Sequence, residues 1–154
     1  PYHIISYGHD IEASWLLHEA ALVLGDKALL NEVEPRVVDI AEAATEGFLP
    51  GAGMLYEQHV DTASIDADRH WWVQAEAIVG YINLYQHFDD RLSLSRAVQC
   101  WEFVKRHLID RENGEWYWSL RADGSVNRHE DKAGFWKCPY HNGRMCMEII
   151  ERFV

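Results

Sequence analysis

The fold of this chain is decided by the stretch RHWWVQAEAIVGYINLYQHF, residues 69–88. It is long enough for a helix of about five turns and is apolar on nearly every side. A helix on the surface of a domain carries a single apolar stripe, whereas a helix that is apolar all round is buried by its neighbours. The sequence therefore predicts a helix over residues 69–88 that lies inside a larger assembly of helices.

Two further helices are predicted before this stretch. Residues 10–24 follow a helical period, with Asp10 as the N-cap residue and Gly25 as the stop signal. Residues 34–45 have Pro35 in the first turn and apolar residues on one side. These signals predict two amphipathic helices that can pack against residues 69–88.

The second half of the chain predicts two more helices and a hairpin. A helix over 92–108 follows Asp90 or Ser93 as its cap, and the last helix runs from about residue 142 to the C-terminus. Between them, the alternating aromatic segment 115–128 contains an Asp-Gly turn and reads as a β-hairpin.

Short turns and long loops alternate between these five helices, and the long loop over residues 47–68 also contains a strand-like piece. That alternation is typical of stacked helical hairpins whose long loops lie at one end. The fold class is therefore all-α, part of an α/α toroid with small β-hairpins in its long loops. No linker interrupts the chain, so we expect residues 1–154 to form a single domain.

Composition excludes several classes of partner. A formal net charge of −11 leaves no basic stripe for nucleic acid or for an anionic membrane. No apolar run approaches the ~20 residues that a membrane span requires. The first residues lack the features of a signal peptide, and the chain starts with Pro1 instead of Met, so we expect a cytoplasmic protein of which this is a part.

Cysteine usage agrees with a cytoplasmic location. Cys100, Cys138 and Cys146 cannot all pair and do not form a disulfide framework, so reduced thiols are expected. Cys138, His141 and Cys146 lack a fourth zinc ligand and a CxxC pair. We expect no metal.

Two histidines stand where predicted helices begin. His9 precedes the helix over 10–24, with Glu12 three residues on, and His141 lies in the loop FWKCPYHNGR before the last helix. The positive end of a helix dipole favours the neutral imidazole, which can act as a base. Glu12 could orient the His9 ring or bind a hydroxyl. The alternative is that Glu12 completes a helix cap and that His9 packs in a turn.

Aromatic and acidic residues accompany these histidines. Trp72 and Glu76 are four residues apart and share a helix face, which suits stacking on a sugar ring and hydrogen bonding to its hydroxyls. Trp136 offers another stacking surface near His141. The alternative is that the tryptophans fill the core and that Glu76 pairs with Arg69 or another cation.

Two imidazoles beside one cavity indicate proton transfer, because removing a proton alpha to a carbonyl and returning it from the other face requires two bases. A pair of carboxylates flanking a glycosidic bond would instead indicate glycoside hydrolysis. No such acidic pair stands out in the sequence, although the sequence alone leaves that alternative open.

Three motifs follow one another along the chain: YGHDIEASWLLHEAA, HWWVQAEAIVGYINLYQ and GEWYWS…DKAGFWKCPYHNGRMCMEII. They resemble the C-terminal part of the cellobiose 2-epimerases, a group within the N-acylglucosamine 2-epimerase superfamily. The resemblance that they carry runs over essentially the whole chain. The resemblance implies the C-terminal part of an (α/α)6 barrel of six helical hairpins. It also implies epimerisation at C2 of the reducing-end sugar of β-1,4-linked disaccharides through an enediolate, with no metal or organic cofactor.

The resemblance also implies roles for individual residues. His9 and His141 match the acid/base pair, and Glu12 is the acidic residue beside the first of them. Trp72 and Glu76 match a substrate-binding helix, and Trp136 matches the ring that stacks on the second sugar.

The family's N-terminal half, with a substrate-binding arginine and a further histidine, has no counterpart in this chain. We therefore expect the chain alone to be inactive and prone to associate, with the missing half of the barrel as the partner that completes the site. The alternatives are an N-acylglucosamine 2-epimerase, a mannose-type aldose–ketose isomerase, or a carbohydrate-binding fragment without activity.

Overall fold

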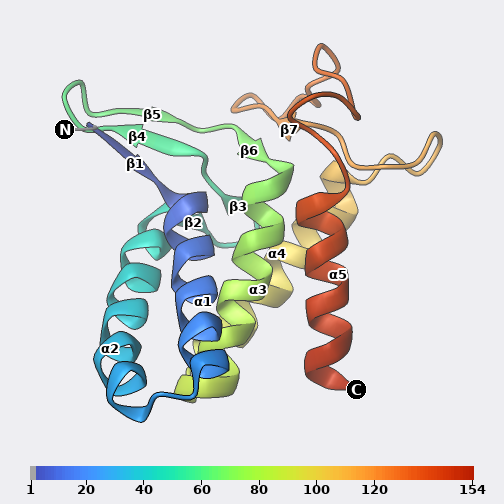
Figure 1. Cartoon of the computed structure of the whole chain (residues 1–154). Helices are drawn as coiled ribbons and strands as arrows, with labels where there is room; N and C mark the ends of the chain where they lie inside the picture. Colours follow the sequence, from blue (N-terminus) through green and yellow to red (C-terminus); the bar gives the residue numbers. More distant parts are fainter. Residues whose placement is uncertain (1–2) are drawn as a thin grey trace.

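Five long helices carry the fold of the computed structural model, which describes residues 3–154 (Figure 1). Helices α1 and α2 form one helical hairpin, α3 and α4 form a second, and α3 packs between α1 and α5. The prediction of a buried central helix is confirmed, because every residue from Trp71 to Leu84 is buried. The helices are α1 (Tyr7–Leu24), α2 (Lys27–Ala44), α3 (Trp71–Phe88), α4 (Arg91–Phe103) and α5 (Tyr140–Phe153).

All the small strands lie at one end of the helices, as predicted for the long loops, while the short α1–α2 and α3–α4 turns lie at the other end (Figure 1). A three-stranded antiparallel sheet has the order β1-β4-β5, and two antiparallel pairs join β2 to β3 and β6 to β7. The strands are β1 (Ile4–Ser6), β2 (Phe48–Leu49), β3 (Gly53–Met54), β4 (Glu57–His59), β5 (Ser64–Asp66), β6 (Arg69–His70) and β7 (Ser119–Leu120). Since α1, α3 and α5 all begin at this end, their N-termini converge there.

Two predicted helix starts were wrong. Helix α1 begins at Tyr7, with Ser6 in the N-cap position, so Asp10 lies inside the helix. Helix α2 begins at Lys27, because the Asp26 side chain accepts hydrogen bonds from two backbone N–H groups, and Pro35 lies inside the helix. Proline removes one helical hydrogen bond, and tertiary packing of the helix outweighs that loss.

The other predicted helix ends are close to the observed ones. Gly25 ends α1 in the left-handed conformation, with φ +68°, and Asp90 caps α4. Helix α4 ends at Phe103 and continues as a π-helical turn, η2 (Val104–Leu108), while a 3₁₀ turn, η1 (Thr45–Gly47), follows α2.

The single hairpin predicted over residues 115–128 is only partly correct. Leu120 and Val126 bridge around the predicted turn, but Trp116 bridges Ile109 and β7 pairs with β6. The segment therefore makes three short pairings instead of one hairpin, because its backbone groups form hydrogen bonds with three different parts of the chain.

Two glycines let α1 approach α3 closely. A Cβ atom at Gly8 would lie 2.6 Å from the Trp72 ring, and one at Gly80 would lie 2.6 Å from Ile11. Since side chains there would force the helices apart, both glycines allow the close approach of α1 and α3.

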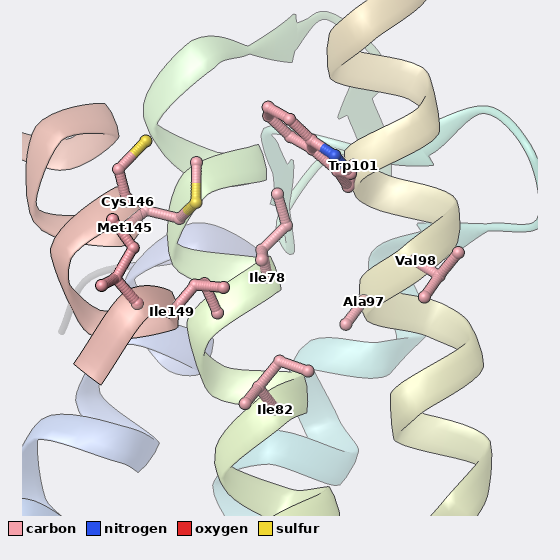
Figure 2. A pocket seen from close by; sticks show the side chains of 9 residues that line it. Ile78, Ile82, Ala97, Val98, Trp101, Met145, Cys146 and Ile149 are labelled. Carbon is pink, nitrogen blue, oxygen red and sulfur yellow. The ribbon is translucent and has the colours of Figure 1, made fainter. Parts of the chain in front are cut away.

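An apolar groove runs along the flank where α3, α4 and α5 meet, with a volume of about 350 Å³ (Figure 2). Side chains from all three helices point into it. The lining residues are Ile78, Ile82, Ala97, Val98, Trp101, Met145, Cys146, Ile149 and Ile150. Within residues 3–154, no helix is both long enough and apolar enough to cross a membrane.

Candidate active site

The first turns of α1, α3 and α5 border a cavity of about 290 Å³, here called the site cavity. Its walls are aromatic and imidazole rings, and the N-termini of three helices, each with a partial positive charge, lie beside it. The lining residues are His9, Tyr56, His70, Trp71, Trp72, Trp118, Trp136 and His141. Four of the six residues that the sequence singled out therefore line one cavity.

His9 lies in the first turn of α1. Its Nδ1 atom is 2.7 Å from the Ser6 hydroxyl, at a position where a serine side chain usually caps the helix backbone. Its ring centroid lies 4.7 Å from that of Trp72. Since Nδ1 is engaged by Ser6, Nε2 is the ring nitrogen that remains for a ligand.

His141 lies in the first turn of α5 and is held in a similar way. Its Nδ1 atom is 2.7 Å from the Glu76 carboxylate, and its ring centroid is 5.6 Å from that of Trp72. Trp72 therefore contacts both imidazole rings. The two rings differ in their support, because a neutral hydroxyl holds His9 whereas a carboxylate holds His141.

Glu76 and Glu12 lie behind His141 and do not line the site cavity. Glu76 is almost fully buried and accepts hydrogen bonds from His141, from Arg144 Nη2 at 2.7 Å and from Trp15 Nε1 at 3.1 Å. Glu12 accepts a bond of 2.5 Å from the same Arg144 nitrogen and lies 4.0 Å from His141 Nδ1. The observed carboxylate contacts of Glu12 are therefore with Arg144 and His141, and the partner of His9 is Ser6.

Arg144 is the charged residue of this site that the sequence reasoning missed. Burial by itself lowers the pKa of the guanidinium, but hydrogen bonds to Glu76 and Glu12 outweigh burial and raise the pKa above its usual value. Its position three residues after His141 on a helix was the available signal, since residues three apart share a helix face. Arg144 therefore pairs with both carboxylates beside the His141 ring.

Glu12, Glu76 and His141 also present ligand atoms within 4.8 Å of one another, a spacing that could suit a metal ion. Arg144 already places a positive charge against both carboxylates. The arrangement is thus a compact network of one histidine, two acids and one arginine.

His70 and Tyr56 form a wall of the site cavity that the sequence did not indicate. Their rings stack with centroids 4.0 Å apart. Burial lowers the pKa of His70, against the opposing effect of Asp66 and Asp68. The pKa of Tyr56 is raised by burial and by nearby carboxylates. Both side chains are therefore neutral at pH 7.

The tryptophans play different parts in the site cavity. Trp72 is only 8% exposed and forms the floor, whereas Trp136 is 79% exposed and stands at the rim. Trp71 packs against Trp118 with ring centroids 4.7 Å apart. Trp72 therefore combines the packing role that the sequence left as an alternative with a place beside both histidines.

Known structures and sequences share this architecture. The chain superposes with a TM-score of 0.91 on the crystal structure of a sugar epimerase from a ruminal bacterium, at 43% identity, covering 98% of this chain and 39% of that one. Such neighbours are (α/α)6 barrels, so the predicted fold class is confirmed and the chain forms part of an (α/α)6 barrel.

Sequence comparisons identify the family. Residues 2–143 match the family model described as N-acylglucosamine 2-epimerase (GlcNAc 2-epimerase). The chain is 64% identical over 149 residues to a cellobiose 2-epimerase of Bacteroides fragilis and 46% identical over 152 residues to one of Ruminococcus albus. These matches cover 97% and 98% of this chain but only 38% and 39% of the two relatives. The chain belongs to the N-acylglucosamine 2-epimerase family.

Proposed function

We propose that this chain contributes the two-histidine part of the active site of a sugar epimerase. The substrate is a β-1,4-linked disaccharide such as cellobiose, and the reaction inverts C2 of its reducing-end sugar to give a glucosyl-mannose product. The observation that carries the proposal is the pairing of His9 and His141 in one aromatic cavity, each held through Nδ1.

In the proposed reaction, the reducing-end ring opens and exposes a C1 carbonyl. One imidazole Nε2 removes the C2 proton, and the electron pair of the C–H bond moves into a cis-enediolate. Rotation about the C2–C3 bond presents the other face of C2, where the second, protonated imidazole returns a proton. The two imidazoles supply the proton-transfer groups for both steps, so the proposal invokes no cofactor.

The network behind His141 has a clear part in this scheme. A carboxylate on Nδ1 holds the ring in one orientation and stabilises the imidazolium that forms on proton uptake. Glu76 has that position, and Arg144 donates a hydrogen bond to the same carboxylate. In this scheme Glu76 acts through His141 and does not bind the sugar directly. Glu12 is assigned to the same network.

The aromatic rings suit a sugar of more than one residue. Trp72 at the floor offers a face beside both histidines, and we assign Trp136, at the rim, to stacking on a second sugar. This rim favours a disaccharide over the monosaccharide substrates of an N-acylglucosamine 2-epimerase or a mannose-type isomerase.

Glycoside hydrolysis is the weaker candidate. An inverting glycosidase requires two carboxyl groups about 6.5–9.5 Å apart on either side of the bond that breaks. Glu12 and Glu76 bond to the same Arg144 nitrogen and do not line the site cavity. Neither carboxylate is free to flank a glycosidic bond.

The test uses a completed protein, in which this chain replaces the matching part of the Bacteroides fragilis relative. With cellobiose in deuterium oxide, the completed protein is expected to form the C2 epimer and to incorporate deuterium at C2. His9→Ala and His141→Ala are each expected to lower deuterium incorporation by roughly 10²–10⁴-fold, the usual contribution of general acid–base catalysis. His129→Ala, which removes an exposed histidine, is the matched control.

Near-normal exchange in either site variant would contradict the two-base assignment. Binding of cellobiose without any exchange would identify a carbohydrate-binding protein. Parallel assays with mannose and N-acetylmannosamine decide between the disaccharide and the monosaccharide substrates.

A further inference from the structure

Lys137 is a buried lysine directly behind the rim of the site cavity. Its side chain is 0% exposed, whereas Trp136, the preceding residue, is 79% exposed. Consecutive side chains of this segment therefore point in opposite directions, one into the protein and one towards the mouth of the site cavity. Such complete burial of an ammonium group is unusual and requires partners for its charge.

The Lys137 ammonium contacts three separate parts of the structure. It donates to Glu115 Oε1 at 3.1 Å and to the carbonyl of Lys132 at 2.9 Å, and it lies 5.2 Å from the centre of the Trp71 ring. Burial lowers the pKa of Lys137, and the Glu115 carboxylate opposes that effect. The ammonium thereby connects the loop to Glu115 and to Trp71, which lines the site cavity.

Lys137 also closes the loop that carries Trp136. Its carbonyl accepts a hydrogen bond of 2.8 Å from the Gly134 N–H, while its side chain bonds to Lys132. Residues 132–137 thus form a tight turn with Trp136 near its tip. The Trp136 ring is nearly all exposed, so the turn, more than packing of the ring itself, determines where the indole stands.

Glu115 extends this connection to the first turn of α5. The same Oε1 atom that bonds Lys137 accepts a hydrogen bond of 2.8 Å from Asn142 Nδ2 and one of 2.9 Å from the Trp116 N–H. Asn142 directly follows His141. Glu115 has a backbone φ of +62°, which is unfavourable for a residue with a side chain and which presents the carboxylate to these donors.

We propose that Lys137 is a positioning residue that fixes Trp136 at the rim of the site cavity through its buried contacts with Glu115, Lys132 and Trp71. The functional part of this inference rests on the proposed epimerase reaction, in which Trp136 stacks on the second sugar. Lys137 then determines the affinity for a disaccharide without taking part in proton transfer.

The positional part is tested on the 154-residue chain by ¹⁵N relaxation. Lys137→Met retains the length of the side chain and removes its charge and its donors. Backbone order parameters of residues 134–138 are expected to fall from the rigid range near 0.85 to below about 0.6. Lys105→Met is the matched control, because Lys105 also pairs with a glutamate, at 2.6 Å, and lies over a tryptophan ring, but on the outside of α4 and η2. Unchanged order parameters in Lys137→Met would overturn the proposal.

The functional part is tested in the completed protein. Lys137→Met is expected to raise KM for cellobiose about tenfold with kcat within about threefold, since loss of an aromatic stacking contact is worth about a factor of ten in affinity. In a Trp136→Ala background, adding Lys137→Met is expected to raise KM no further. Glu115→Gln, which retains the shape of Glu115, is expected to raise KM by about threefold. This variant replaces Lys137→Met in the test if Lys137→Met does not fold.

A proportional loss of kcat and of folded protein, with KM unchanged, would show a purely structural lysine and overturn the proposal. An additive rise of KM in the Trp136→Ala background would also overturn it. If the completed protein has no epimerase activity with Lys137 intact, the proposed function fails, while the relaxation experiment still decides the positional role.

Discussion

The site cavity and the apolar groove are built on the same helices at different heights. Helix α3 gives Trp71 and Trp72 to the site cavity and Ile78 and Ile82 to the groove, and α5 contributes His141 to the cavity and four apolar residues to the groove. The groove is the larger of the two hollows, about 350 Å³ against about 290 Å³. Only the cavity has imidazoles held by hydrogen bonds at helix N-termini. The site cavity is the candidate active site because of its side chains, and not because of its volume.

The largest expected effect is at Glu76, whose carboxylate bonds to His141 beside the site cavity. Glu76→Gln removes the negative charge behind His141 and is expected to lower C2 exchange in the completed protein by roughly 10²-fold. It also weakens the charged hydrogen bonds to Arg144, at a cost of about 1.5–3 kcal/mol in the free energy of unfolding. Deuterium incorporation and urea unfolding measure the two effects.

The control for this variant is Glu148→Gln, because Glu148 pairs with Arg152 within α5 at 3.2 Å, away from the cavity. Exchange in Glu148→Gln is expected to stay within about threefold of the parent. Equal losses in the two variants would show that the role assigned to Glu76 is incorrect.

A substitution in the apolar groove is expected to have the opposite pattern. Ile82 is 5% exposed and lines the groove from α3. Ile82→Ala is expected to lower the free energy of unfolding by about 2–5 kcal/mol, because it removes buried apolar contacts and leaves a void. C2 exchange per folded molecule is expected to stay unchanged.

Urea unfolding and exchange assays of Ile82→Ala again provide the two readouts, with Leu92→Ala as control. Leu92 lies on α4 and is 67% exposed, so its truncation should change stability by less than about 0.5 kcal/mol. A large loss of exchange per folded Ile82→Ala molecule would show that groove and cavity are coupled.

The smallest expected effect concerns pH and the cavity wall at His70. Burial lowers the pKa of His70 in the folded state, so the unfolded chain binds the proton more readily. The stability that this histidine contributes is present above the unfolded-state pKa of about 6.5 and is lost as the pH falls below it. His70→Gln is expected to flatten this fall by at most about 1.4 kcal/mol per pH unit.

Urea unfolding at pH 7.5 and at pH 5.5 measures this slope for His70→Gln and for the exposed-residue control His129→Gln. The control is expected to keep the slope of the parent. An unchanged slope in His70→Gln would mean that the pKa of His70 is the same in the folded and unfolded states.

Patterns local in sequence predicted most of the fold correctly. The apolar stretch over 69–88 indicated α3, and Gly25 and Asp90 marked helix ends, because capping depends on residues a few positions apart. Where a signal had two meanings the prediction failed, as with Pro35, which suits a first turn and also fits inside a helix that packing stabilises. The hairpin over 115–128 failed for a similar reason, since strand pairing depends on partners far along the chain.

By itself, the sequence determined the helical class, the helix-start positions of His9 and His141, and the motifs that mark the family. Only the tertiary structure decided that Ser6 holds His9, that Glu76 and Arg144 support His141, and that Lys137 closes the loop beneath Trp136. Helix signals arise from neighbours within one or two turns. The contacts around His141 join segments up to 132 residues apart, and only the packing of α1, α3 and α5 brings those segments within hydrogen-bond distance.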